Sequence, residues 1–298
     1  MDIRQLQYLA SLAREKHFTR AAAACNITQP TLSGRIRQLE QELGVPIIER
    51  GQRYHGLTPE GERVLAWART ILDNWQSMQQ DLAKLRSRKG ELVGRMVLGV
   101  IPSALPMVSL LTQEMQIEHP SVEFTIFSQS SEEILRALRD FSIEAGVTYL
   151  DNEPVEGMLE APLYREKYCL FVLENHRLAG RENVTWRDAA AEPLCLLTPN
   201  MQNRRIIDAA FQKAGCRPVP KLETNSIVNL FASIRRMGLA SIMPEYFSEI
   251  LGPIKGLAKI PLSDPEIEHT VGVITIRREP LSPHVSALFA AARRFKAD

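Results

Sequence analysis

The residues best suited to recognise another molecule lie on one face of a helix predicted over residues 29–43. Its apolar side chains Leu32, Ile36, Leu39 and Leu43 recur every three or four positions, so they are expected to form one buried stripe. The opposite face carries small polar groups with amide and guanidinium ends, a surface that fits a DNA major groove and hydrogen-bonds base edges. A solvated helix face is the alternative for these residues taken alone. The residues expected to contact DNA from this helix and the turn before it are Thr28, Gln29, Pro30, Thr31, Ser33, Gly34, Arg37 and Gln38.

The segments around this helix predict a helix-turn-helix. Residues 20–25 are rich in alanine, which favours a short helix, and Thr19 is expected to cap it. Residues 26–28 then form a turn in which Thr28 caps the next helix, and Pro30 lies in the first turn, where its missing N–H is not needed. A short helix, a tight turn and a proline-started helix together favour DNA recognition over a plain solvated face.

A β-wing is predicted directly after this helix. Residues 45–58 contain two short apolar stretches around a tip with glycine and arginine residues. Arg50, Arg53 and His55 are expected to reach phosphates or the minor groove. Contacts of this kind supply affinity and salt dependence more than sequence choice.

The charge of the chain is unevenly distributed. The 298 residues are 45% hydrophobic and 24% charged, as in an ordinary globular protein. Residues 1–90 hold 14 basic and 9 acidic residues, a net charge of +5. The rest of the chain holds 22 basic and 26 acidic residues, a net charge of −4. A basic segment on an acidic body is the pattern of a nucleic-acid-binding head, which the overall net charge of +1 conceals.

A long amphipathic helix is predicted over residues 59–89. Thr58 supplies an N-cap, Pro59 the first helical position, and basic residues the last turn. Apolar side chains recur at spacings of three or four from Val64 to Leu85. Because a small head cannot bury so long a stripe, we expect the same helix of a second copy to cover it, giving a homodimer or homotetramer. Packing against its own domain is the alternative.

Several segments within about the first sixty residues resemble, in order, the N-terminal signature of LysR-type transcriptional regulators. They are FTRAA at 18–22, TQPTLS at 28–33, IRQLE at 36–40, LG at 43–44 and LTPEG at 57–61. The resemblance implies a dimer or tetramer that binds an inverted-repeat operator in double-stranded DNA, with RNA polymerase as a further candidate partner. It also implies an effector domain of two lobes, like a periplasmic binding protein, behind the linker helix.

Two positions depart from the family pattern. Gly34 stands where the family usually has a longer side chain, and a glycine within a helix costs about 1 kcal/mol relative to alanine. One contact to DNA is therefore expected to be missing or moved. Ile48 replaces an aromatic residue of the wing strand, which we interpret as a change in packing.

The sequence after residue 90 predicts an α/β fold with a mostly parallel sheet, because short apolar runs alternate with helical segments. The expected strands are 96–100, 122–128, 144–148, 168–173, 195–197, 240–243 and 270–276. The expected helices are 107–118, 132–141, 204–214, 227–237 and 282–295.

Combined with the resemblance, these elements predict a two-lobed α/β effector domain behind an all-α-type winged helix-turn-helix head. The chain is expected to cross between the lobes near residues 159–163 and 261–268. The expected parts are the winged head at 1–58, the linker and dimerisation helix at 59–89, the effector domain at 90–298, its lobe I at about 90–161 and 266–298, and its lobe II at about 162–265.

The loops after the predicted strands form the candidate effector site, because ligands of open α/β sheets bind at the carboxyl ends of strands. These loops match those that line the effector cleft in LysR-type proteins. Their hydroxyl and amide groups suit a small polar ligand, above all an anion such as a carboxylate, with Arg204 and Arg205 supplying positive charge and no buried acid to repel it. Helix capping is the alternative role for each serine and threonine. The residues expected to bind the effector are Pro102, Ser103, Ala104, Ser128, Gln129, Thr148, Thr198, Asn200, Gln202, Asn203, Asn225 and Ser226.

Two other classes of function are weighed against this one. An enzyme is disfavoured because the sequence lacks a dinucleotide-binding glycine motif, a phosphate-loop lysine motif, H-E-x-x-H and G-x-S-x-G. Its six histidines show no metal-ligand spacing, so neither a metal nor a cofactor is expected. A thiol-based redox regulator using Cys195 and Cys216 remains the alternative, although buried free thiols are the simpler interpretation of the cysteines.

The hypothesis is a sequence-specific DNA-binding regulator switched by a small effector. The ligand would favour one closure state of the two lobes and so change the spacing of the DNA-binding heads and the bending of the operator. The sequence shows no signal peptide and no membrane-spanning run, so we expect a cytoplasmic protein without a membrane partner.

Overall fold

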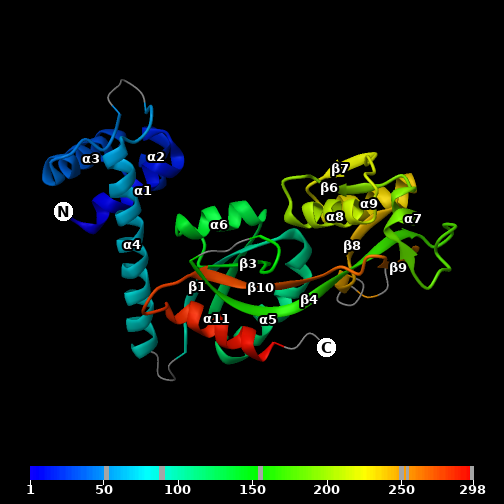
Figure 1. Cartoon of the computed structure of the whole chain (residues 1–298). Helices are drawn as coiled ribbons and strands as arrows, with labels where there is room; N and C mark the ends of the chain where they lie inside the picture. Colours follow the sequence, from blue (N-terminus) through cyan, green and yellow to red (C-terminus); the bar gives the residue numbers. More distant parts are fainter. Residues whose placement is uncertain (50–53, 87–90, 154–156, 248–251, 253–254, 296–298) are drawn as a thin grey trace. The chain divides into compact units, whose positions relative to one another are not determined.

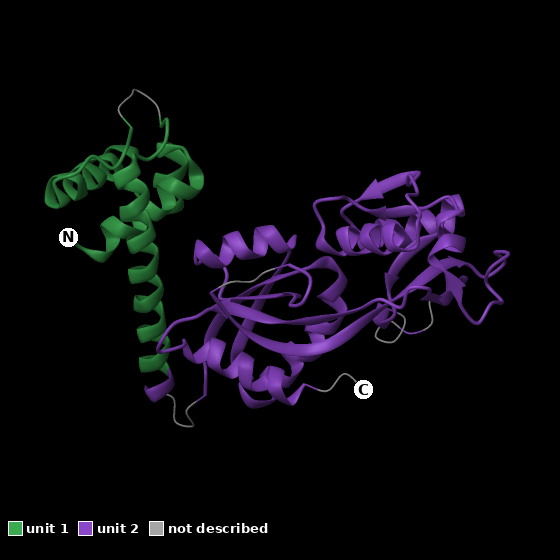
Figure 2. Ribbon diagram, in the orientation of Figure 1, with its two compact units in different colours: residues 1–83 green, residues 84–298 purple. Residues whose placement is uncertain are grey.

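The structure is a computed structural model that describes residues 1–49, 54–86, 91–153, 157–247, 252 and 255–295. The chain divides into two compact units, residues 1–83 and residues 84–298 (Figure 2). Each unit has its own hydrophobic core. Within the described ranges no helix combines the length and apolar character needed to cross a membrane.

The first unit is built from helices. Its elements are α1 (Ile3–Glu15), α2 (Phe18–Ala24), α3 (Gln29–Leu43) and most of α4 (Pro59–Arg86) (Figure 1). Leu9 of α1, Leu32, Ile36 and Leu39 of α3 and Leu65 of α4 are buried together in the core. The predicted stripe of α3 is therefore confirmed except at Leu43, which is 40% exposed because it is the last residue of the helix.

The cap of α2 differs from the prediction. His17, and not Thr19, precedes the helix, and its ring Nδ1 accepts a hydrogen bond from the backbone N–H of Thr19 at 3.2 Å. Because an imidazole nitrogen satisfies the free N–H groups of a first turn as a hydroxyl does, the helix begins at Phe18. Thr28 caps α3 as predicted, accepting from the N–H of Thr31.

The end of α3 is tied to the wing by one carboxylate. Glu40 accepts hydrogen bonds from the backbone N–H groups of Ile47 at 2.7 Å and Ile48 at 3.0 Å. Ile48 then forms an antiparallel bridge with Leu57 at the base of the wing. The orientation of the wing base is thus fixed by α3.

The start of α4 packs closely on the same segment. The Thr58 hydroxyl donates to the carbonyl of Pro46 at 2.6 Å and accepts from the N–H of Gly61 at 2.9 Å, so it both caps α4 and anchors the loop. A Cβ atom on Gly61 would lie 2.1 Å from the carbonyl oxygen of Ile47. Glycine is required here by close approach of the backbone.

The second unit combines strands and helices (Figure 1). Its strands are β1 (Gly94–Val100), β2 (Val122–Ser128), β3 (Ala145–Tyr149), β4 (Met158–Leu173), β5 (Val184–Thr185), β6 (Cys195–Leu197), β7 (Leu222–Thr224), β8 (Ser241–Pro244), β9 (Leu257–Ser263) and β10 (Glu268–Ile276). Its helices are η1 (Pro102–Ala104), α5 (Leu105–Glu118), α6 (Ser131–Arg139), α7 (Trp186–Ala190), α8 (Gln202–Lys213), α9 (Ile227–Met237) and α11 (Pro283–Arg294). The predicted α/β alternation is confirmed.

The sheet is mixed and not mostly parallel. In lobe I the order is β2-β1-β3-β10-β4, with β1 parallel to β2 and β3 but β10 antiparallel to β3 and β4. In lobe II, β4 pairs antiparallel with β8 and β9. The chain leaves lobe I along β4 and returns along β10, so these two long strands must run in opposite directions.

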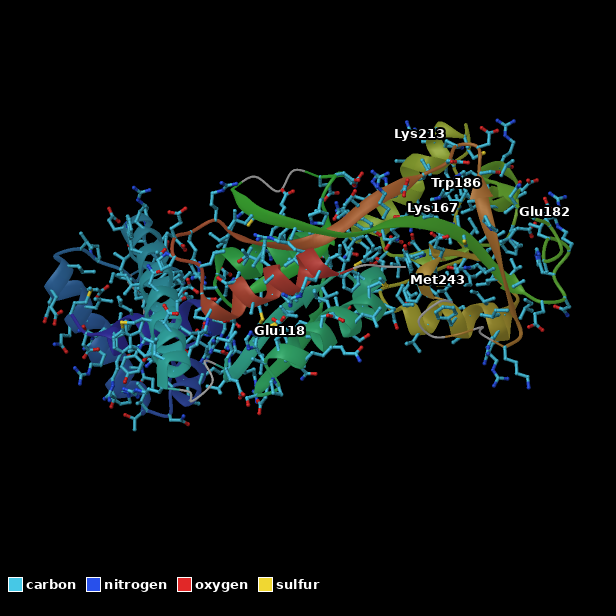
Figure 3. The ribbon with its side chains drawn as sticks, turned by 90° about the horizontal axis from the view of Figure 1, so that it is seen from below. Glu118, Lys167, Glu182, Trp186, Lys213 and Met243 are labelled. Atoms are coloured by element: carbon cyan, nitrogen blue, oxygen red, sulfur yellow. The ribbon has the colours of Figure 1, made fainter. Side chains whose placement is uncertain are left out.

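Strand β4 belongs to both lobes. It pairs with β10 as far as Lys167 and with β8 from Tyr168 onward, so the first crossing lies at these two residues, later in the chain than the predicted 159–163. Figure 3 shows β4 as one continuous green strand that carries Lys167. The second crossing lies at residues 264–267, between β9 and β10.

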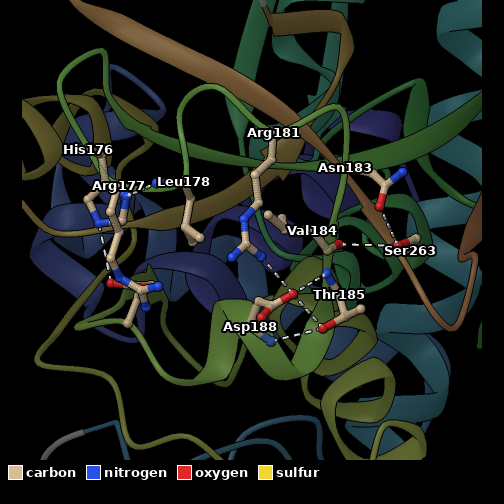
Figure 4. Close-up of polar contacts among 10 residues, drawn as sticks. His176, Arg177, Leu178, Arg181, Asn183, Val184, Thr185, Asp188 and Ser263 are labelled. Atoms are coloured by element: carbon tan, nitrogen blue, oxygen red, sulfur yellow. Dashed lines mark hydrogen bonds and ion pairs between the residues drawn. The ribbon is translucent and has the colours of Figure 1, made fainter.

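Lobe II is braced beside the second crossing by α7 (Figure 4). The Thr185 hydroxyl accepts from the N–H of Asp188 at 3.0 Å, and the Asp188 carboxylate accepts in return and pairs with Arg181 at 3.5 Å. This capping box holds the fully buried Trp186, whose indole N–H donates to the carbonyl of Pro265 at 2.9 Å.

We predict that Gly61→Ala and Gly34→Ala change stability in opposite directions. The added methyl group at position 61 would clash with backbone, so the free energy of unfolding should fall by about 1–3 kcal/mol. At position 34 no atom lies within 4 Å of the added Cβ, so Gly34→Ala should raise the free energy of unfolding by up to about 1 kcal/mol. Urea unfolding followed by circular dichroism measures both, and equal effects would contradict the packing described.

Candidate functional site

The surface of α3 opposite the core is open to solvent. Ser33 is half-buried, and the other predicted DNA-contacting residues of this helix and its turn are exposed. These exposed residues are Thr28, Gln29, Pro30, Thr31, Gly34, Arg37 and Gln38.

The polar side chains of this face are partly preorganised. The Gln29 amide donates to the Ser33 hydroxyl at 2.9 Å. Arg37 and Gln41 line a hollow of about 600 Å³ between α3 and residues 44–49. In the described part of the chain Arg37 forms no ion pair, so its guanidinium group is available to an external acceptor.

The wing carries one described candidate residue. His55 is exposed, and its neighbour Gly56 accepts the N–H of Glu49 at 3.2 Å across the wing base. Arg50 and Arg53 lie outside the described residues.

The structure brings several predicted effector residues together between the lobes. From lobe II, the side chains of Gln202 and Asn203 at the start of α8 reach lobe I. The Thr148 hydroxyl donates to Gln202 Oε1 at 3.1 Å, and the Asn203 amide donates to the Tyr149 hydroxyl at 3.1 Å. Ser103 Oγ lies 3.1 Å from the same hydroxyl. All of these side chains are buried, so the lobes are closed on one another here.

The Tyr149 hydroxyl continues this network into the protein. It donates to a carboxylate oxygen of Glu166 and accepts from the hydroxyl of Tyr168 at 3.2 Å. Tyr164, Glu166 and Tyr168 alternate along β4 and all face the interior, whereas residues 165 and 167 are exposed. A fully buried acid surrounded by tyrosines thus lies behind the interlobe contact.

Burial alters the acidity of this cluster. Removal from water raises the pKa of Glu166 from 4.5 to about 7, although the tyrosine hydrogen bonds act in the opposite direction. Burial, with the nearby Glu166 carboxylate, also raises the pKa values of Tyr149, Tyr164 and Tyr168 well above 10. The tyrosines therefore remain protonated near neutral pH while Glu166 exchanges its proton.

A second contact joins the lobes through Arg205 of α8. Its guanidinium group makes two bonds to the carboxylate of Glu153, at 2.6 and 2.9 Å, and approaches the Ser131 hydroxyl at 3.3 Å. It also donates to the carbonyls of Pro199 and Asn200, at 3.3 and 2.8 Å. Such two-point pairing fixes orientation more firmly than a single ion pair.

These contacts correct the expected electrostatics of the cleft. Arg204 is paired with Asp208 at 2.9 Å and Glu223 at 2.5 Å, and Arg205 with Glu153. Their positive charges are already neutralised by protein carboxylates. A buried acid, Glu166, is also present, contrary to the prediction. An anion would have to displace Glu153 to reach a guanidinium group.

The other predicted effector residues fall into different environments. Gln129 Oε1 and Thr198 Oγ1 are buried and have no hydrogen-bond partner among the described residues. The Ser226 hydroxyl accepts from the N–H of Asn229 at 3.4 Å, the helix-capping alternative considered for serines. The remaining ones are Pro102 and Ala104, which are buried, and Ser128, Asn200 and Asn225, which are exposed.

The prediction omitted Tyr149, Glu166 and Glu153 as site residues. A signal was present for Glu166, because strict alternation with Tyr164 and Tyr168 places it on the apolar face of a strand. The partnership of Glu153 with Arg205 had no local signal, since the two residues are brought together only by the approach of the lobes.

The cysteines show no reactive arrangement. Cys195 is fully buried, and burial raises the pKa of its thiol to about 11, which disfavours the nucleophilic thiolate. It packs with Leu197 and α9 residues, whereas Cys216 packs against the cluster of Leu196, on the other face of β6. These positions do not favour a disulfide between them. Among the described residues no group of three or more His, Cys, Asp or Glu is placed to hold a metal ion.

A helix-turn-helix whose second helix exposes a polar face, together with a separate unit of two lobes, defines a DNA-binding transcriptional regulator. The comparisons with known families agree. Residues 3–62 match the model of the bacterial regulatory helix-turn-helix protein, lysR family, and residues 89–297 match the LysR substrate binding domain. The chain therefore belongs to the LysR family of transcriptional regulators, which confirms the resemblance seen in its sequence.

Characterised relatives span nearly the whole chain. The DNA-binding transcriptional dual regulator OxyR of Escherichia coli is 30% identical over 297 residues, covering 98% of this chain and 95% of that protein. The hydrogen peroxide-inducible genes activator of Haemophilus influenzae is 28% identical over 284 residues, covering 94% and 92%.

Solved structures share the fold. A cysteine-to-aspartate variant of full-length OxyR from Pseudomonas aeruginosa superposes with a TM-score of 0.77 at 24% identity, covering 98% of this chain and 95% of that one. Full-length CbnR in complex with its target DNA superposes with a TM-score of 0.68 at 19% identity, covering 99% of this chain and 100% of that one.

We predict that Arg205→Ala loosens the closed lobes. Loss of the two-point pair with Glu153 should speed amide hydrogen exchange in residues 198–203 in the free protein, because it leaves the Glu153 carboxylate without its partner. Arg165→Ala is the matched control: it removes an exposed 3.5 Å pair with Glu268 and should leave that exchange unchanged. Unchanged protection in Arg205→Ala would show that the pair does not hold the lobes.

Proposed function

We propose that this regulator binds an inverted-repeat operator through α3 and that a small polar effector sets the closure of its two lobes. The observation that carries this proposal is the pair of hydrogen bonds, Thr148 to Gln202 and Asn203 to Tyr149, that joins the lobes where LysR-type proteins bind effectors. A ligand that favours one closure state shifts the balance only by its differential affinity for the two states.

The DNA-binding role rests on the exposed face of α3. Arg37 is free of ion pairs in the described structure, and a guanidinium group makes paired hydrogen bonds with guanine. His55, with Arg50 and Arg53 of the wing segment, is assigned to the phosphate backbone, where such residues supply affinity. RNA polymerase remains a further proposed partner of the DNA-bound regulator.

We expect Arg37→Ala to lower specific operator binding by about 1–3 kcal/mol while nonspecific binding changes less. Arg14→Ala is a suitable control, because Arg14 is equally exposed but lies on α1 and pairs with Glu15. Electrophoretic mobility titrations against operator and scrambled DNA give the specificity ratio. An unchanged ratio in Arg37→Ala would remove this residue from the readout.

We also propose that α4 pairs with the α4 of a second copy. In this protein its side chains Trp67, Ile71, Trp75, Met78, Leu82 and Leu85 are 38–81% exposed. An apolar stripe along one helix is the surface that a helical partner buries. A homodimer formed this way, or a homotetramer of two such dimers, presents paired heads to an inverted repeat.

Ile71→Glu should weaken self-association, since it places a charge in the proposed helix seam. Val219→Glu is the control, because Val219 is an 87% exposed apolar residue that belongs to the other unit and not to α4. Sedimentation velocity distinguishes the two. Equal association of both variants would contradict the seam.

The cleft residues suggest that the effector is a small polar molecule. A ligand of the native state raises the melting temperature, so a thermal-shift screen of small carboxylates, inorganic anions and neutral polar compounds tests the site. We expect Gln202→Ala to abolish the shift and Gln212→Ala, an exposed glutamine of the same helix, to keep it. A compound that still raises the melting temperature of the Gln202→Ala variant binds outside the proposed cleft.

A peroxide response is the second candidate function, because the Haemophilus influenzae relative is a hydrogen peroxide-inducible genes activator by name. The buried, high-pKa thiol of Cys195 is unsuited to that chemistry. Replacing Cys195 and Cys216 together by serine and measuring operator binding with and without peroxide tests the pair. An unchanged oxidant response would dismiss these two cysteines.

The proposed parts are a winged head at 1–58, a linker at 59–89 and an effector domain at 90–298. Because the family consists of regulators, we propose regulation without catalysis, in the cytoplasm where the operator DNA lies.

A further inference from the structure

We propose that Glu166 couples closure of the two lobes to protonation: its protonated carboxyl group stabilises the closed arrangement and its carboxylate disfavours it. The inference rests on the proposed function only in treating lobe closure as the regulated step. It concerns the free protein, without effector or DNA.

The position of Glu166 makes it sensitive to closure. It precedes the crossing at Lys167 and Tyr168, where β4 passes from the lobe I ladder to the lobe II ladder. Its side chain is fully buried. One hydroxyl, that of Tyr149, separates it from Asn203, which comes from lobe II.

The groups around Glu166 give a carboxylate little support. Tyr149 of β3 donates to one carboxylate oxygen, whereas the second oxygen, Oε2, and the nearby Tyr164 hydroxyl are buried without a hydrogen-bond partner among the described residues. Glu245, which follows β8, repels the carboxylate. Tyr246 packs edge-on against Tyr164, with ring centroids 5.1 Å apart. In the described structure no cationic side chain pairs with Glu166.

A titratable base across the strand ladder, His269, is already engaged. His269 of β10 lies opposite Glu166 in the strand ladder, and its ring packs edge-on against that of Tyr149 with centroids 6.1 Å apart. Its Nδ1 lies 3.0 Å from the carboxylate of Asp151. His269 therefore pairs with Asp151 and does not supply a counter-charge to Glu166.

Protonation would also change the direction of the hydrogen bonds. A carboxylate must accept the Tyr149 proton, which leaves that hydroxyl only as an acceptor, for Tyr168 and for Asn203. A protonated Glu166 can instead donate to Tyr149, which frees the phenol proton for the Ser103 hydroxyl. The lobe contact then no longer requires a buried charge.

The sign of the pH effect follows from burial. In the closed arrangement burial raises the pKa of Glu166 to about 7, and hydration on opening returns it towards 4.5. The stabilisation of the closed arrangement by protons is complete below about pH 4.5 and is lost as the pH rises to about 7. Between pH 5 and pH 8 the closed-to-open ratio should fall about 70-fold, since each unit of pKa difference corresponds to about tenfold.

The experiment measures closure directly. Fluorophores attached to non-natural residues on α6 and α7, which avoid the native cysteines, report the distance between the lobes by energy transfer from pH 5 to pH 8. Wild type should open as the pH rises, and E166Q, whose amide cannot ionise, should give a flat profile. A flat wild-type profile, or an E166Q profile like that of wild type, would overturn the proposal.

A matched variant separates titration from loss of a contact. E153Q weakens the other interlobe contact, to Arg205, but keeps Glu166. E153Q should lower the closed fraction at every pH and keep its dependence on pH. A flat pH profile in E153Q would show that Glu153, and not Glu166, is the titrating group.

An infrared titration of the wild-type protein tests the proton itself, even if E166Q fails to fold. The C=O stretch of a protonated buried carboxylic acid should disappear with a midpoint near pH 7. Its disappearance near pH 4.5 would contradict the proposal. Neither measurement uses an effector, so a failed ligand screen leaves this test intact.

Discussion

The hydroxyl group of Tyr149 links the parts of the second unit that must act together. It sits at the end of β3, bonds the Asn203 amide of lobe II and Ser103 of lobe I, and donates to Glu166 on the strand that both lobes share. Loss of the hydrogen bonds of a buried polar group is costly, so the lobes, the hydroxyl and the acid constrain one another. The cleft is thus a network with defined partners.

In the first unit, core packing holds α3 so that its opposite face is exposed to solvent. The core side chains of α3 hold the helix, and Glu40 and Thr58 tie the wing base and α4 to it. The residues proposed to contact DNA then need few contacts of their own. Free donors such as the Arg37 guanidinium group suit an external partner.

The sequence predicted features that depend on local signals and missed those that depend on the approach of distant segments. Thr28, Pro30 and the apolar stripe marked α3, because caps, proline and periodicity act within one helix. Glu153 and Arg205, 52 residues apart, meet only when the lobes close. Arg204 and Arg205 were expected to serve a ligand, since two of their carboxylate partners, Glu223 and Glu153, are on distant segments of the chain. Only residues 168–173 of β4 were predicted as a strand, because charged residues interrupt the apolar pattern of its first part.

The central claim is that lobe closure controls how the heads hold DNA. The most direct test measures the bend of an operator fragment, selected by the protein itself, by energy transfer between its two ends in complexes of wild type and Arg205→Ala. The account predicts that the variant binds the fragment but bends it by a different angle, because its lobes are no longer held by Glu153. Identical bend angles, with the loosened lobes verified by hydrogen exchange, would contradict it.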